Sequence, residues 1–373
     1  MCKLAEALAR HEPLDDIEGI SYKLNGKIIS NKPRDLRDIN TLKPVSFDLL
    51  EMERYIFEGP LGKRSIFWNS SQGCPYHCGF CSTAAVYRRR WSGLNAASLL
   101  GQIKKLASDY NIDGIAFAED NFFVDVRRVE ELCRGLIKNK TKIKWASDAR
   151  IDQINRFSGE FMCLLKESGC RKLYIGAESG DQETLDLIDK KIRLEDTYKT
   201  AEKLDSHKII SEFFIIVGFP LNPEKDLKNS LELIKKIKLR YPDHQFTAFL
   251  YTPYPGTPLL DLAVKKGFVI PKTLEGWSDW SILSVNTPWI DKKYLDTVNM
   301  YSKCFYLLAF PSASLRSSFK KGFIGLVYFV LHKLAGFRVK NNFFALPLEW
   351  KLIKIFYKLK IRFNVFKNIE SFR

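Results

Sequence analysis

Three cysteines lie within eight residues of the segment SQGCPYHCGFCST, and their spacing is the strongest chemical signal in the sequence. Cys74, Cys78 and Cys81 form a C-x3-C-x2-C pattern, whereas the other five cysteines are scattered. A structural zinc site normally has four ligands, and no second C-x2-C is available to complete one. Three thiolates on one loop can instead hold three irons of a [4Fe–4S] cube and leave the fourth iron open to a small molecule. The spacing therefore favours a reactive iron–sulfur centre, with structural zinc as the alternative.

The composition is that of a globular protein with reduced thiols. The chain has 373 residues, of which 46% are hydrophobic, enough for one large core or two domains. Eight cysteines in this length do not form the dense disulfide framework of a small secreted protein. The first residues, MCKLAEALARHE, contain no long apolar segment that would predict a signal peptide. These features predict a cytoplasmic protein.

The elements that must position the cysteines alternate along the chain. Short apolar runs predict strands, and amphipathic segments between them predict helices. The predicted strands are 65–71, 113–119, 142–148, 172–178, 209–219 and 245–251. Such alternation predicts parallel βαβ units, as a partial (β/α)6 TIM-like barrel or, alternatively, an open doubly wound sheet. In either fold, ligands bind at the carboxyl ends of the strands.

Composition divides the chain into three parts. Residues 1–60 predict a short helix, a hairpin turning at Asn25-Gly26 and a proline-containing linker. Residues 61–275 hold the predicted barrel. Residues 276–373 predict a mainly helical extension that is basic and aromatic.

The cysteine motif, with the aromatic Phe80 just before Cys81, resembles that of the radical S-adenosylmethionine (SAM) superfamily. The resemblance implies that the three cysteines bind a [4Fe–4S] cluster whose open iron is chelated by SAM. It further implies that an electron, from a donor of the flavodoxin or ferredoxin type, cleaves SAM to a 5′-deoxyadenosyl radical. That radical would abstract hydrogen from a substrate that the sequence does not identify, and no catalytic side chain is assigned for that step.

The same resemblance implies residues that hold SAM. Glu119 and Asp120 in FAEDNFF match the segment that binds the methionyl ammonium, although Asp120-Asn121 could simply turn the chain. Glu178 in IGAESGD matches the position that meets the ribose hydroxyls. Twelve residues further, many members have an arginine that pairs with the SAM carboxylate. This chain has Lys190 there, a cation that cannot form the bidentate contact.

Two further residues follow from the family pattern. Gly218, at the end of FFIIVGFP, matches the segment that approaches the adenine. Arg150, in WASDARID, matches a recurrent arginine that could contact SAM or substrate, or form a salt bridge within the barrel.

Several segments are similar to the cobalamin-binding branch of the superfamily, across roughly residues 15 to 280. They include the N-terminal hairpin, GAESGD and YPGTPL. Members usually carry an N-terminal cobalamin domain, and this chain begins where the linker normally follows it. The signature D-x-H-x-x-G is absent. We therefore expect either a truncated product or a protein that works without bound cobalamin, which places cobalamin-dependent methyl transfer in doubt.

The C-terminal part of the chain has its own composition. Residues 305–373 hold thirteen Lys and Arg against two Glu, together with sixteen aromatic residues. Such a segment could cap the barrel with its apolar face, contact an anionic membrane or a lipid-like substrate, or bind nucleic acid. The absence of a known RNA-binding motif disfavours the last partner.

These observations predict a radical SAM enzyme acting on a small-molecule or lipid-like substrate. Its peripheral contact with the inner membrane face would involve residues 305–373. One alternative is a truncated, non-catalytic protein that binds the cluster and SAM. The other is a radical SAM enzyme that modifies nucleic acid.

Overall fold

The fold is built on one curved, mostly parallel sheet. The computed structural model describes residues 2–278, 287–311 and 322–358. Within them, the main sheet has the strand order β11-β10-β9-β8-β7-β4-β3. Its strands are β3 Phe57–Gly59, β4 Gly62–Trp68, β7 Gly114–Phe117, β8 Lys144–Ala149, β9 Cys170–Glu178, β10 Ile210–Val217 and β11 Gln245–Leu250. All neighbours pair in parallel except β3, which runs antiparallel to β4 at the edge.

The strand order decides between the two predicted folds. β4 and β7 to β11 follow one another across the sheet in sequence order, without the reversal that defines a doubly wound sheet. The sheet is therefore the predicted partial (β/α)6 barrel, and the doubly wound alternative is excluded. Each of the six predicted strands is present, whereas the short edge strand β3 was not predicted.

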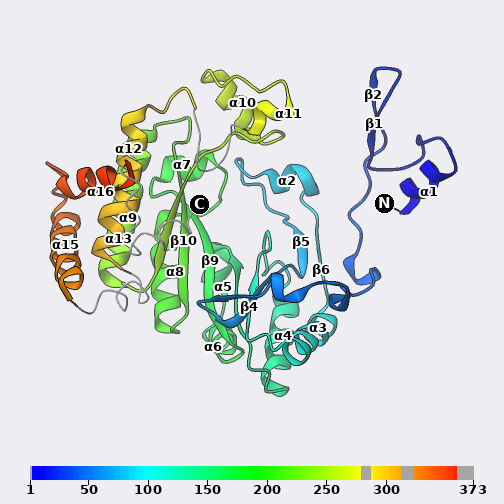
Figure 1. The fold of residues 1–373 in the computed structure, drawn as a ribbon, viewed down its shortest axis with the longest axis horizontal. Coiled ribbons are helices and arrows are strands. Elements are labelled where there is room, and N and C mark those ends of the chain that lie inside the picture. Colours follow the sequence, from blue (N-terminus) through cyan, green and yellow to red (C-terminus); the bar gives the residue numbers. More distant parts are fainter. Residues whose placement is uncertain (1, 279–286, 312–321, 359–373) are drawn as a thin grey trace.

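Helices cover the outer face of the sheet (Figure 1). Those in the barrel are α3 Ala96–Asp109, α4 Val126–Lys138, α5 Ile151–Arg156, α6 Gly159–Glu167, α7 Gln182–Leu187, α8 Leu194–Ser206, α9 Pro223–Arg240 and α10 Pro258–Lys265. Side-chain caps explain several of their starts: Asn95 accepts from Ser98 N at 2.8 Å, and Asn222 caps α9 with Pro223 in its first turn.

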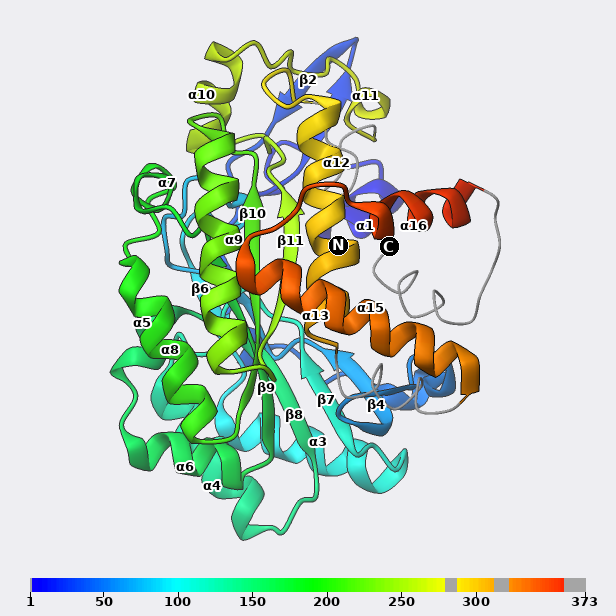
Figure 2. The same ribbon diagram turned by 90° about the vertical axis from the view of Figure 1, so that its left-hand side faces the viewer.

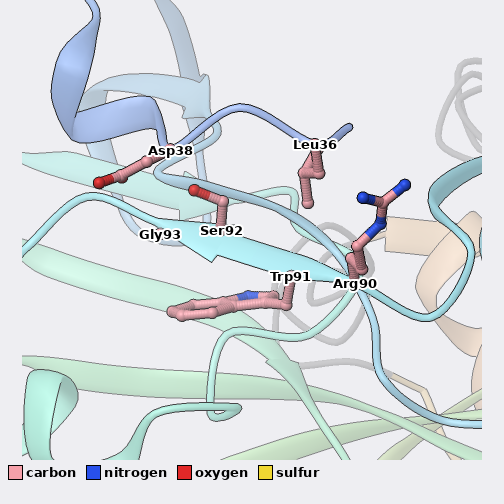
Figure 3. A pocket seen from close by; sticks show the side chains of 6 residues that line it. All are labelled: Leu36, Asp38, Arg90, Trp91, Ser92 and Gly93. Carbon is pink, nitrogen blue, oxygen red and sulfur yellow. The ribbon is translucent and has the colours of Figure 1, made fainter. Parts of the chain in front are cut away.

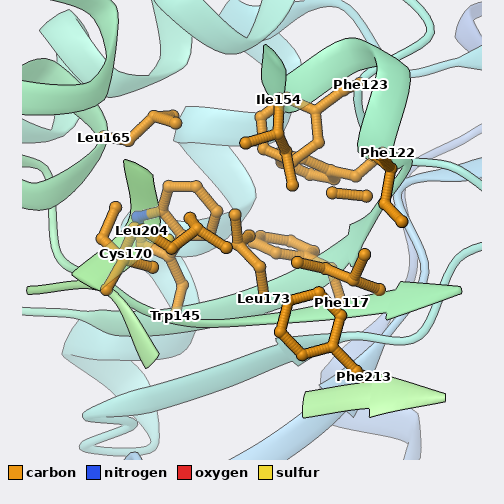
Figure 4. Close-up of a cluster of buried hydrophobic side chains, with 14 of the residues drawn as sticks. Phe117, Phe122, Phe123, Trp145, Ile154, Leu165, Cys170, Leu173, Leu204 and Phe213 are labelled. Atoms are coloured by element: carbon orange, nitrogen blue, oxygen red, sulfur yellow. The ribbon is translucent and has the colours of Figure 1, made fainter. Parts of the chain in front are cut away.

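The main core lies between the sheet and these helices. Figure 4 shows Phe117, Trp145, Leu173 and Phe213, which come from four neighbouring strands, packed with Phe122. The ring centroids of Phe117 and Phe122 are 4.8 Å apart in a stacked arrangement. Along β10, buried and half-buried residues alternate, because successive side chains of a strand point to opposite faces.

The N-terminal region consists of a short helix, a hairpin and three 3₁₀ turns that precede the barrel. α1 Cys2–Ala9 precedes the hairpin of β1 Ser21–Leu24 and β2 Lys27–Ser30. Asn25 and Gly26 both have positive φ, at 49° and 79°, as the predicted type I′ turn requires. Three short 3₁₀ turns follow at Ile39–Thr41, Phe47–Leu49 and Met52–Arg54.

The extension forms a second, smaller core beside α9. It contains α11 Leu274–Ser278, α12 Lys292–Met300, a π turn at Tyr301–Phe305, α13 Tyr306–Ala309, α15 Gly322–Asn341 and α16 Leu348–Lys358. Phe305, Ala335 and Trp350 are buried together in this core. The Tyr306 hydroxyl donates to the Leu231 carbonyl of α9 at 2.7 Å, which joins the extension to the barrel.

The predicted helical extension is therefore confirmed for the described residues. The basic, aromatic part of the chain, residues 305–373, lies partly outside them, since residues 312–321 and 359–373 are not described. The predicted division at residues 60 and 275 stays a prediction. No helix in the described ranges is long and apolar enough to cross a membrane.

Candidate iron–sulfur and SAM site

The three cysteines lie on a loop within a small hairpin at the carboxyl-terminal end of the barrel. The loop connects β5 Ser71–Gly73 to α2 Ser82–Tyr87, and β5 pairs antiparallel with β6 Trp91–Gly93. Figure 1 shows α2 at the same end of the molecule as α7 and α10. Gly73 has φ +84°, and a Cβ there would overlap the Arg90 carbonyl. Only glycine therefore fits at position 73, where the two strands of the hairpin approach closely.

Backbone hydrogen bonds anchor the middle of this loop. Gly79 N donates to the Ile188 carbonyl, at the end of α7, at 2.8 Å. The Gly79 carbonyl accepts from Leu259 N of α10 at 3.0 Å. Two distant barrel units therefore fix the backbone between Cys78 and Cys81.

Asp120 anchors both ends of the same loop. One carboxylate oxygen accepts from Gly73 N at 2.9 Å, and the other accepts from the Thr83 hydroxyl, also at 2.9 Å. Asp120 follows β7, so the strand end that was predicted to bind SAM also positions the cysteine segment. A carboxylate oxygen has two acceptor sites, so these bonds leave capacity for a ligand.

The three thiols are the donor groups that proteins use to bind iron–sulfur clusters. All three are free, and Cys78 is buried while Cys74 and Cys81 are half-buried. Burial raises the pKa of Cys74, and the neighbouring Cys78 and Cys81 add to the effect.

Ligands of one zinc ion crowd together, because each lies about 2.3 Å from the metal. Among the described residues, no three His, Cys, Asp or Glu side chains are gathered in this way. Three cysteine thiols on one loop are donors of the kind that bind a [4Fe–4S] cluster with one open iron, so their chemistry suits such a site.

Arg150 connects the cysteine loop to the second half of the barrel. Its Nη1 donates to the Cys78 sulfur at 3.4 Å, and its Nη2 donates to the Lys190 carbonyl at 3.0 Å. Its Nε pairs with Asp152 at 2.8 Å, and its guanidinium lies 3.6 Å from the centre of the Tyr76 ring. Burial lowers the pKa of Arg150, but Asp152 and Cys78 more than offset this effect and raise it.

Glu119 is buried against the backbone of the strand that leads into β5. Its carboxylate accepts from Ser70 N at 2.7 Å and from the hydroxyls of Ser70 and Ser71. The buried Arg128 of α4 donates to the Ser70 hydroxyl and, at 2.6 Å, to the Leu94 carbonyl. Glu119 thus belongs to a buried polar network that fixes the entry to the hairpin.

Glu178 and Lys190 form a buried ion pair. Lys190 Nζ lies 2.7 Å from Glu178 Oε1, and both side chains are 7% exposed. Burial lowers the pKa of Lys190, but Glu178 and Cys78 raise it above the ordinary value overall. A Cβ at Gly176 would overlap the Glu178 carboxylate and crowd the Lys190 amine. The glycine two residues before Glu178 therefore makes room for the pair.

Phe80 and Gly218 lie at the next strand end. The Phe80 ring meets Phe219 edge-on, with centroids 6.0 Å apart. Gly218 has φ +85°, and its carbonyl accepts from Trp289 Nε1 at 2.9 Å. A Cβ at Gly218 would overlap Ile290. The backbone at this strand end is thus held in a conformation that favours glycine.

The concave face of the sheet carries further polar groups. Register places Asp148 beside Tyr174, and Tyr174 beside Glu212. Lys172 pairs with Glu212 at 2.5 Å. Burial raises the pKa of Asp148 to about 7, and the neighbouring Glu119 and Asp120 add to the effect. The sequence analysis did not identify Asp148, because nothing in WASDARID shows that this aspartate faces other carboxylates.

Two hollows border the cysteine hairpin, and neither is lined by the three cysteines. One, of about 420 Å³, lies between Leu36, Asp38, Arg90 and the β6 strand (Figure 3). A larger one, of about 1060 Å³, lies among α4, α5 and α6 and reaches Tyr76. Neither is the proposed cofactor site.

The structure brings the predicted residues together to different degrees. Arg150, Lys190 and Glu178 are linked by direct contacts to one another or to Cys78. Glu119 and Asp120 contact the strand and loop that carry the cysteines. Phe80 and Gly218 lie beside Phe219. Sequence analysis missed the supporting residues Ser70, Ser71, Tyr76, Arg128 and Trp289, which carry no motif.

Comparison with known proteins agrees with this arrangement. Residues 68–234 match the model of the radical SAM superfamily. An uncharacterized methyltransferase of Pyrococcus horikoshii is 31% identical over 273 residues, covering 72% of this chain and 56% of that protein. The anaerobic magnesium-protoporphyrin IX monomethyl ester cyclase of Rubrivivax gelatinosus is 24% identical over 245 residues, covering 65% of this chain and 43% of that protein.

A solved structure extends the likeness to nearly the whole fold. The cobalamin-dependent S-adenosylmethionine radical enzyme OxsB, with aqua-cobalamin and S-adenosylmethionine bound, superposes with a TM-score of 0.67 at 18% identity. The match covers 96% of this chain and 57% of that chain. This chain spans about half the length of the curated relatives that it matches. Residues 68–234 therefore form a radical SAM domain, and proteins of this superfamily use a [4Fe–4S] cluster and SAM.

Proposed function

We propose that the chain is a radical SAM enzyme that reductively cleaves SAM and functionalises a C–H bond of an organic substrate. The observation that carries this proposal is the loop of three free thiols, anchored by Asp120 and contacted by Arg150 through Cys78. When bound, the cluster supplies an electron that splits SAM into methionine and a 5′-deoxyadenosyl radical, which takes a hydrogen atom from substrate.

The chain's own residues would bind and orient the reactants. Cys74, Cys78 and Cys81 would hold the cluster. Glu119 and Asp120 would accept hydrogen bonds from the methionyl ammonium, because their carboxylate oxygens have acceptor positions that the protein does not use. Arg150 places positive charge beside the buried Cys78 sulfur, where it stabilises negative charge on the thiolate.

Glu178 and Lys190 would contact different groups of SAM. In the described structure they neutralise each other at 2.7 Å in a buried site. On ligand binding, Glu178 would accept from the ribose hydroxyls and Lys190 would approach the SAM carboxylate. Phe80 and the backbone at Gly218 would flank the adenine. The pair thus keeps both charges compensated before SAM arrives.

The substrate class is inferred from the relatives and from the C-terminal composition. The matched proteins include a methyltransferase and an enzyme named for a large tetrapyrrole substrate. Together with sixteen aromatic residues after position 304, this supports a lipid-like or other apolar small molecule. Methyl transfer or a related C–H functionalisation is the proposed reaction.

The proposed partners follow from the same reaction. An electron donor of the flavodoxin or ferredoxin type would reduce the cluster, and residues 305–373 would contact a membrane peripherally. The intact thiol loop and its supporting network disfavour the alternative of a non-catalytic remnant. Nucleic acid as substrate is also not favoured, since the relative from Rubrivivax gelatinosus is named for a small-molecule substrate.

Anaerobic reconstitution with iron and sulfide tests the proposal. The reduced protein should convert SAM to 5′-deoxyadenosine, measured by liquid chromatography. A Cys78→Ala variant should not. Failure of well-folded, iron-loaded wild-type protein to cleave SAM would overturn the proposal.

A further inference from the structure

Helix α15 has a large apolar face that no described residue covers. Its buried side faces the second core through Ala335 and Val339, which are 0% exposed. On the opposite side, large apolar residues are exposed at helical spacing. They are Leu326 (60%), Val330 (47%), Leu334 (46%) and Phe337 (60%). A helix that is apolar all round normally has a partner on every side, so this face lacks one among the described residues.

Apolar residues are exposed beyond α15 as well. Phe343 and Leu346, in the connection to α16, are 49% and 72% exposed, and Leu348 and Leu352 of α16 are 59% and 53% exposed. Figure 2 shows α15 and α16 on the same side of the barrel, with the C-terminal end of α15 beside α9. Exposed apolar side chains gathered on neighbouring helices mark a binding site for a protein or a membrane.

Cations border this apolar face. Lys333 and Lys340 are exposed on α15, and Lys351 is exposed on α16. The Lys333 amine lies 5.4 Å from the centre of the Phe329 ring, so its stem follows the apolar surface while the charge reaches its edge. Within α15 and α16 the sole carboxylate is Glu349, which is buried and paired with Arg338 at 2.8 Å. The face therefore presents apolar groups bordered by Lys333, Lys340 and Lys351, none of which forms an ion pair with a described residue.

We infer that this α15–α16 face, defined by Leu326, Val330, Leu334, Phe337 and Leu352, docks on an anionic lipid surface. The inference rests on the membrane contact proposed above and assigns it to a specific surface. Apolar side chains enter the acyl boundary, and the bordering lysines meet lipid phosphates. A second protein copy is the competing occupant, but it would bring a second set of like charges against the first.

Flotation of the full, reconstituted chain with vesicles tests the inference. The expected result is binding to vesicles that contain phosphatidylglycerol and weaker binding to pure phosphatidylcholine. The L334D/F337D variant should lower the partition coefficient by about tenfold or more, since two anchors become charged. The matched control is V269D/L274D, which makes the same charge change at residues that are 79% and 82% exposed elsewhere.

A second variant separates charge from apolar contact. K333E/K340E should weaken binding to the anionic vesicles and leave binding to phosphatidylcholine unchanged. Circular dichroism and light scattering check that each variant is folded and report its oligomeric state. Equal flotation of wild type and L334D/F337D would overturn the inference, as would a wild-type dimer that this variant dissociates. Neither result bears on SAM cleavage, which is measured without vesicles.

Discussion

At the carboxyl ends of the strands, charged groups are buried and paired, whereas on α15 large apolar groups are exposed to solvent. Glu178 and Lys190 are each 7% exposed and 2.7 Å apart, but Leu326 and Phe337 are each 60% exposed. Burying charge without a partner costs several kcal/mol, so the barrel end must satisfy its polar groups internally. The α15–α16 face carries no such constraint. The barrel end thus pairs its own charged groups, whereas the α15–α16 face exposes apolar groups that an external partner would cover.

The largest expected effect is the loss of the buried cluster ligand. Cys78→Ala should abolish SAM cleavage, with a fall of more than about 100-fold, beyond the effect of removing an outer partner of a metal ligand. Iron content and 5′-deoxyadenosine formation are the measurements. Cys163→Ala is the control, because Cys163 is exposed on α6, away from the loop. Equal losses in both variants would mean that the loop is not the cluster site.

Removing one partner of the buried ion pair should destabilise the fold. Lys190→Ala leaves Glu178 charged and unpaired, so we expect the free energy of unfolding to fall by about 3–5 kcal/mol. Denaturant unfolding measures this loss. Lys191→Ala is the matched control, since Lys191 pairs with Asp189 at 2.6 Å but is 79% exposed. Its unfolding midpoint should barely move, and a similar shift in both variants would contradict the described burial.

Arg150→Lys tests whether one guanidinium links the two halves of the site. A lysine cannot contact Cys78, Asp152 and the Lys190 carbonyl together, because it lacks the planar fork of donors. We expect SAM cleavage to slow by about 10- to 100-fold, with the cluster still bound and its reduction potential shifted. The control is Arg156→Lys, whose exposed side chain also bonds to Asp152. An unchanged rate and potential would show that Arg150 does not act on the cluster.

The smallest predicted effect is on the pH dependence of stability and concerns the buried carboxyl group of Asp226. Burial raises the pKa of Asp226 to about 7, so this group holds its proton more tightly in the folded chain than in the unfolded chain. Its contribution to stability is therefore complete below about pH 4 and is lost between there and about pH 7. The gain in stability of Asp226→Asn over wild type should be about 1–2 kcal/mol larger at pH 8 than at pH 5.

Unfolding curves at the two pH values give this comparison directly. A gain for Asp226→Asn that is equal at pH 5 and pH 8 would contradict the raised pKa.

The sequence was sufficient for the barrel because its signal is local. Apolar runs such as 172–178 and 245–251 coincide with β9 and β11 to within two residues. The pattern that predicts a strand or a helix depends only on residues close together in the sequence. The edge strand β3 has three residues, and the β5–β6 pairing spans seventeen residues of intervening loop and helix. Short elements with distant partners carry too little local pattern to be predicted.

Site residues that belong to a sequence motif could be predicted, whereas residues that reach the site through tertiary packing could not. The cysteine spacing is readable in one short segment. By contrast, the contact of Arg150 with Cys78 joins residues 72 positions apart, and the bond from Ser70 to Glu119 spans 49. Such contacts arise only when strand ends meet at one edge of the barrel. Periodicity gave no indication that Asp120 holds both ends of the cysteine loop.

The central claim is a cluster with three protein ligands and an iron that SAM occupies. Electron paramagnetic resonance of the reduced, reconstituted protein tests it most directly, recorded before and after SAM is added. The account predicts a [4Fe–4S]⁺ signal that changes when SAM binds and that is absent from Cys78→Ala. A signal indifferent to SAM, or a colourless protein that retains one zinc ion instead of iron, would contradict the account.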